Sequence, residues 1–104
     1  MDKVLIEEGT FKNSNSFYQL KVNDYGLLIG GRDELFDLRE AIDRYKFHIT
    51  QQRTNSFIVS GSKGIIFINS KFNKKIWFKE KQLSNVYDQI LEKLTIEKKK
   101  SWKW

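Results

Sequence analysis

RDELFDLREAIDRY, residues 32–45, decides the fold, because it reads as one helix standing between two groups of strands. Leu35, Leu38, Ile42 and Tyr45 recur at the spacing of a single helix face. Asp33 stands in the first turn or caps it, where a negative charge suits the helix dipole. We therefore expect an amphipathic helix whose apolar face packs against a sheet.

Three short strands are expected before this helix, over residues 4–6, 17–22 and 27–29. In the second, FYQLKV, alternate positions are apolar, as in a strand with one buried face. Its residues on the other, uncovered face are Phe17, Gln19 and Lys21. Residues 23–26, NDYG, read as the turn of a hairpin.

Four strands and a second helix are expected after it. The strands span residues 47–52, 56–60, 65–69 and 74–80, and the helix spans residues 82–98. The order is thus βββα-ββββα. It predicts an α+β fold with a mainly antiparallel sheet and both helices packed on one side of that sheet.

The length of 104 residues fits one domain, which we place at residues 1–97, followed by a basic, tryptophan-containing tail at residues 98–104. No run is long and apolar enough for a membrane span, and the first residues do not read as a signal peptide. We therefore expect a cytoplasmic protein. The many Lys, Asn and Ile residues indicate a bacterial or phage origin.

No catalytic or metal-binding signature is recognisable. The chain has no cysteine and one histidine, His48, which is expected on a strand. The acidic residues of the first helix alternate with arginines, as on a solvated, self-paired helix face. Gly30 and Gly31 match neither a P-loop nor a dinucleotide fingerprint. We predict a non-catalytic protein without a cofactor or metal.

The net charge of +6 is unevenly distributed along the chain. Residues 1–52 hold seven Lys/Arg and nine Asp/Glu, or 7 − 9 = −2, whereas residues 53–104 hold twelve and four, or 12 − 4 = +8. A basic half indicates an anionic partner, although lysines also keep a small aromatic-rich protein soluble.

A tryptophan shares a predicted strand face with lysines in KKIWFKEK, residues 74–81. Trp77 lies between Lys75 and Lys79 on one face, while Ile76 and Phe78 point to the other. Two interpretations remain open for Trp77. It is a stacking surface for bases whose phosphates meet the lysines, or it is a core residue with lysine stems packed beside it.

The first interpretation predicts a small protein that binds nucleic acid, with single strands favoured, or an anionic nucleotide. The residues predicted to bind are Phe17, Lys21, Arg53, Lys74, Lys75, Trp77, Lys79, Lys81, Lys98, Lys99, Lys100 and Trp102. The strand and helix order also resembles the doubled sheet-plus-helix architecture of Whirly and purine-rich-element-binding proteins. That resemblance implies single-strand binding, but it includes no sequence motif.

The alternative is a protein-binding inhibitor or immunity-type protein of a phage or mobile element. Small size and exposed aromatic anchors suit this function equally. Its partner would be an acidic protein or one that handles nucleic acid. Because no proline protects any strand, a sheet edge also allows a homodimer. No membrane partner is expected.

Overall fold

The structure, a computed structural model, describes residues 4–10, 12–13, 15–48, 50–61, 64–71 and 73–101. Of Phe78 and residues 96–101 it describes the backbone alone. Two antiparallel sheets form, which we call sheet A and sheet B. Sheet A comprises β1 (Val4–Thr10), β2 (Ser16–Val22) and β3 (Tyr25–Gly30). Sheet B comprises β4 (Gln52–Arg53), β5 (Phe57–Gly61), β6 (Ile65–Asn69) and β7 (Lys74–Phe78).

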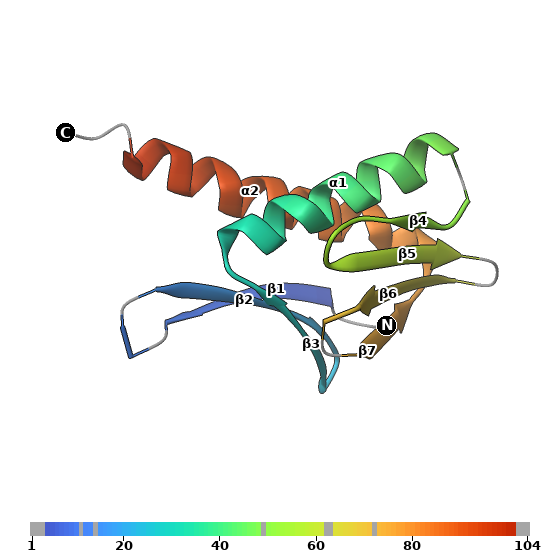
Figure 1. The fold of residues 1–104 in the computed structure, drawn as a ribbon, viewed down its shortest axis with the longest axis horizontal. Coiled ribbons are helices and arrows are strands. Elements are labelled where there is room, and N and C mark those ends of the chain that lie inside the picture. Colours follow the sequence, from blue (N-terminus) through green and yellow to red (C-terminus); the bar gives the residue numbers. More distant parts are fainter. Residues whose placement is uncertain are drawn as a thin grey trace.

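Both helices lie on the same side of the two sheets, and among the described residues no helix lies on the other side (Figure 1). Helix α1 (Arg32–His48) follows sheet A; the short 3-10 helix η1 (Glu80–Gln82) and helix α2 (Leu83–Ser101) follow sheet B. The predicted α+β class and the order βββα-ββββα are therefore confirmed. We call the uncovered side the outer face of each sheet.

Several predicted boundaries were wrong, and β1, for example, extends to Thr10 instead of ending at residue 6. Residues 47–48 extend α1, and β4 is only Gln52–Arg53, instead of a strand over 47–52. Lys46 and His48 thus stand in the last turn of α1, where cations suit the helix dipole. Helix α2 continues to Ser101, past the predicted end at residue 98.

One hydrophobic core joins both sheets to both helices. Its side chains come from alternate strand positions and from one stripe of each helix, as the periodicity predicts. Its largest fully buried side chains are Tyr18, Phe57 and Phe67.

Asn23, Gly30 and Asn73 have a positive φ, which few residue types tolerate. Asn23, in the two-residue connection between β2 and β3, has φ of 58°, which asparagine adopts more readily than most residues. Gly30 ends β3 with φ of 120°, a conformation that side chains disfavour. The chain can then begin α1 with a hydrogen bond from the Leu35 N–H to the Gly31 carbonyl.

A buried asparagine links the two sheets. Asn69, at the end of β6, is only 1% exposed, and its amide nitrogen donates to the Leu28 carbonyl on β3 at 2.6 Å. This contact satisfies a polar group that would be costly to bury alone. Strand β3 lies beside β6 and β7, although no ladder joins the sheets there.

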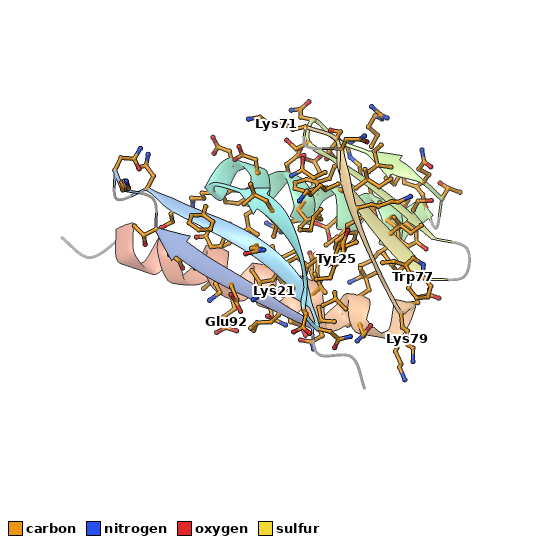
Figure 2. All side chains as sticks on the ribbon, turned by 90° about the horizontal axis from the view of Figure 1, so that it is seen from below. Lys21, Tyr25, Lys71, Trp77, Lys79 and Glu92 are labelled. Atoms are coloured by element: carbon orange, nitrogen blue, oxygen red, sulfur yellow. The ribbon has the colours of Figure 1, made fainter. Side chains whose placement is uncertain are left out.

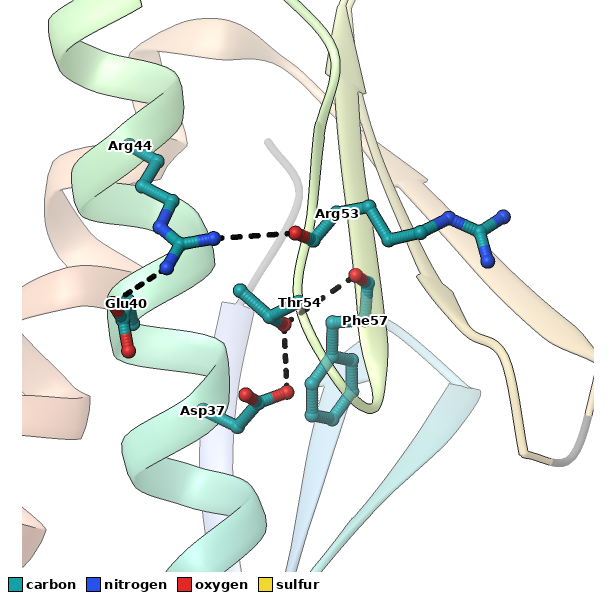
Figure 3. A network of polar contacts seen from close by, with 6 residues as sticks. All are labelled: Asp37, Glu40, Arg44, Arg53, Thr54 and Phe57. Atoms are coloured by element: carbon teal, nitrogen blue, oxygen red, sulfur yellow. Dashed lines mark hydrogen bonds and ion pairs between the residues drawn. The ribbon is translucent and has the colours of Figure 1, made fainter.

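Helix α1 also holds the first hairpin of sheet B (Figure 3). The Asp37 carboxylate accepts hydrogen bonds from the Thr54 hydroxyl at 2.6 Å and from the Ser56 N–H at 2.9 Å. Arg44 pairs with Glu40 at 2.9 Å, as the sequence spacing predicts, and also donates to the Arg53 carbonyl at 3.4 Å. These contacts hold β4 and the connection that follows it against α1.

Candidate nucleic-acid interface

The outer face of sheet B combines cations, isoleucines and one tryptophan. The register aligns Arg53, Ile58, Ile68 and Lys75 in one row across the four strands. The next row contains Ser60, Ile66 and Trp77. None of these seven outward residues is acidic. A polyanion that crosses the strands would therefore meet a cation at each end of the first row.

Trp77 is exposed and does not belong to the core. Its side chain is 53% exposed, whereas its neighbour Ile76 is buried in the core. The indole lies over Gly64, the residue before β6, where a Cβ would come within 2.5 Å of the ring atom Cζ2. Absence of a side chain at Gly64 thus lets the indole rest against the strand.

A hollow of ≈ 550 Å³ opens beside Trp77, at the junction of the two sheets. Tyr25, at the start of β3, contributes a second aromatic side chain to it and is 60% exposed. Figure 2 views the outer face and shows Tyr25 on sheet A and Trp77 on sheet B. The remaining lining residues are Val22, Asn23, Ile66, Lys75 and Ile76. The hollow is thus mainly apolar, with Lys75 as its charged residue.

Arg53, Lys75 and Lys79 are the predicted cations that the structure brings to this face. The Arg53 side chain points away from α1, while its carbonyl faces the helix (Figure 3). Lys79 follows β7 at the same end as Trp77 (Figure 2) and is exposed. The Gln82 side chain accepts a hydrogen bond from its N–H at 3.0 Å, which fixes the chain as it leaves the strand.

Two predicted residues lie on the outer face of sheet A. Lys21 is 3.7 Å from the Glu7 carboxylate, so part of its charge is already compensated. Phe17 lies over Gly9 on the neighbouring strand β1 and is only half-exposed. Neither residue lines the hollow beside Trp77.

The other predicted residues are separated from this face. Lys74 alternates with Lys75 and pairs with Asn69, so it is exposed at the opposite side of β7. Lys81 is exposed on η1. Lys98, Lys99 and Lys100 belong to the last turns of α2, which lie far from β7 (Figure 1), and Trp102 is outside the described residues.

Tyr25 and the outward isoleucines were not predicted as part of the site. Tyr25 stands in a segment that reads as a turn, and it meets Trp77 only because β3 lies beside β7. One sequence signal could have identified Tyr25. It stands next to a tight turn, and residues at turns lie on the surface, where binding residues are frequent. Ile66 and Ile68 on β6 are only half-buried, so they contribute apolar surface to the outer face.

Most acidic residues of the first half of the chain lie on α1, on the far side of the sheets. Asp37 holds β5, and Asp43 lies 3.7 Å from Arg39. His48 ends the helix and makes an edge-to-face contact with Phe47, with ring centroids 5.0 Å apart. Within the described residues, no three His, Asp or Glu side chains are grouped as metal ligands.

Two tyrosines of the helix layer have a raised pKa. Burial raises the pKa of Tyr45, and the charge of Glu80 adds to the effect. A hydrogen bond with Asp43 is the largest cause that raises the pKa of Tyr87, whose ring also lies 4.4 Å from the Lys46 ammonium. Neither tyrosine lies on the outer face.

Comparison with protein families, with curated proteins and with solved structures gave no match for this chain. Across the described residues, neither helix has the length and apolar character that a membrane crossing demands. The function is therefore inferred from the geometry of the outer face.

Proposed function

We propose that the protein binds single-stranded nucleic acid on the outer face of sheet B. The observation that supports the proposal is Trp77, a half-exposed aromatic side chain on an uncovered sheet and adjacent to Lys75. Aromatic rings stack on the flat faces of bases, and nearby cations contact the phosphates. Stacking contributes about 1–3 kcal/mol per base and tolerates every base, so little sequence specificity is expected.

Single strands fit this face better than a duplex. The bases of a duplex already stack on each other, so their flat faces are closed to Trp77. Duplex readers commonly insert a helix or a two-stranded ribbon into the major groove. Here both long helices lie on the opposite side of the sheets, and the outer face presents side chains from the body of four paired strands.

A protein-binding function, as an inhibitor or immunity-type protein, is the second candidate. The surface that favours it is the exposed side of α1, where Phe36 and Phe47 are 42% and 84% exposed. They line a hollow of ≈ 620 Å³ together with acidic and basic side chains of the same helix. Exposed aromatic residues are frequent anchors of protein interfaces.

Fluorescence anisotropy with labelled single-stranded and duplex oligonucleotides of equal length, each at two salt concentrations, tests the first function. We expect salt-sensitive binding that prefers the single strand and weakens in Trp77→Ala and Lys75→Ala. The matched controls are Phe47→Ala, an exposed aromatic on α1, and Lys12→Ala, an exposed lysine between β1 and β2.

Absence of binding at low salt, or equal weakening in Phe47→Ala and Trp77→Ala, would contradict the nucleic-acid function. The protein-binding function instead predicts a complex with one protein at physiological salt that Phe47→Ala weakens and Trp77→Ala leaves intact.

A further inference from the structure

The hollow between the two sheets has the shape and lining of a site for one flat apolar group. Its volume, ≈ 550 Å³, lies within the range of about 300–1,000 Å³ of small-ligand sites. Val22 and Ile76, two of its lining residues, are buried core residues. Tyr25 and Trp77 are largely exposed and stand on different sheets.

The two aromatic side chains differ in how the fold supports them. Trp77 lies over Gly64, and its row neighbour is Ile66, so one side of the indole rests on sheet B. Tyr25 directly follows the Asn23–Asp24 turn and pairs with Val22 across it. The link between Asn69 and Leu28 joins the two sheets at another point along β3 and β6. Both aromatic residues are thereby presented from fixed strands.

The charge around the hollow favours a group that belongs to an anion. Lys75 is the charged residue of the lining, and no Asp or Glu is among the lining residues. Lys75 also begins the row that ends at Arg53, three strands away. At about 4.8 Å per strand this row is about 14 Å long, a span over which a strand presents several phosphates.

We propose that this hollow receives one unpaired nucleobase of the bound strand, in contact with both Tyr25 and Trp77. The adjoining phosphates then lie on the row from Lys75 to Arg53. The inference rests on the proposed function and adds to it a defined base site that both sheets build. If Trp77 stacked on bases by itself, Tyr25 would not be needed for binding. In a shared site, both side chains are needed to hold the base.

Comparing two strands of the same length tests this site. One is an eight-residue oligothymidylate, and the other has the same phosphodiester backbone without bases. The measured quantity is the ratio of their dissociation constants, because phosphate contacts contribute to both strands and base contacts to one. We expect the wild-type protein to prefer the strand with bases.

Tyr25→Ala and Trp77→Ala are each expected to lower this preference by about 5- to 150-fold, the equivalent of one stacked base. The double variant should lose less than the product of the two single effects, because both side chains contact the same base. Tyr25→Phe should keep the preference. Lys75→Ala should weaken both strands without changing their ratio.

The outcomes separate the two proposals. If the wild-type protein binds neither strand, the proposed function fails. If it prefers the strand with bases and Tyr25→Ala keeps that preference while Trp77→Ala loses it, the shared base site is wrong and the function stands. The shared site would also be wrong if the double variant lost the preference by the full product of the two single effects. Urea unfolding of each variant confirms that the fold is retained.

Discussion

Trp77 lies among cations because the strand that carries it is covered on one side only. Its position opposite Ile76 was predictable from the alternation along β7. The exposure of Trp77 was not predictable, because it depends on whether another layer of the fold covers the outer face. The sequence of one strand does not contain that information. The same applies to Ile66 and Ile68, which a sheet covered on both sides would have buried completely.

Because Trp77 is exposed, we expect its replacement by alanine to have only a small effect on the stability of the fold. We expect Trp77→Ala to lower the free energy of unfolding by about 1–2 kcal/mol, because roughly half of the side chain remains in water. Phe67→Ala, at a fully buried position of β6, should lower it by about 3–5 kcal/mol. Urea unfolding followed by far-UV circular dichroism measures both, and equal losses would contradict the exposed placement.

Tyr45 predicts a loss of stability at alkaline pH. Burial raises its pKa above the usual value near 10, and Glu80 raises it further, so the folded state retains a proton that the unfolded state releases. The contribution of Tyr45 to the free energy of unfolding should therefore be constant below pH 10 and fall as the pH rises through the folded pKa. Tyr45→Phe should reduce this fall. An identical alkaline slope in wild type and variant would exclude Tyr45 as its source.

At the scale of elements, the order of strands and helices was predictable, whereas several boundaries were not, above all the end of α1. Residues 47–52 contain Phe47, His48 and Ile49, a pattern that also suits a strand. The helix extends to His48 because Tyr45 is buried in the core, which keeps the chain helical into its last turn. Tertiary packing thus determines the secondary structure of a short stretch whose local sequence pattern suits both a helix and a strand.

Edge protection is a second property that only the assembled elements reveal. β1 pairs with β2 on one side, and its other side faces α2. There the Gln89 amide replaces a neighbouring strand, because it accepts from the Ile6 N–H at 2.7 Å and donates to the Val4 carbonyl at 2.9 Å. Asn85 holds the amide in place at 3.0 Å. An open edge of this kind would be a template for pairing with another chain.

Gln89→Ala should therefore lower the free energy of unfolding by about 1–3 kcal/mol, the sum of two typical hydrogen bonds. Self-association through the freed edge should increase with protein concentration. Asp88→Ala, at an exposed neighbouring position of α2, is the control. Chemical unfolding and light scattering after size exclusion measure the two effects. A variant as stable and as monomeric as the control would show that Gln89 does not protect the edge.

For the whole molecule, the fold gathers part of the basic half of the chain on one face. The outward positions of sheet B include Arg53 and Lys75 and no acidic residue, while α1, on the other side of the sheets, carries five acidic and four Lys/Arg residues. The uneven charge was visible in the sequence. The grouping of Arg53 and Lys75 on one face was not, and neither was the hollow, because Tyr25 and Trp77 belong to different sheets that packing brings together.

This distribution predicts how binding depends on salt. If Arg53, Lys75 and Lys79 each neutralise one phosphate of a single strand, log Kd should rise with log salt concentration with a slope of about 2, since each contact contributes about 0.7. Arg53→Ala and Lys75→Ala should each reduce the slope by about 0.7, whereas Trp77→Ala should weaken binding at an unchanged slope. Lys12→Ala should alter neither quantity. A slope that Arg53→Ala leaves unchanged would mean that the strand does not reach β4, and the path across sheet B would then be wrong.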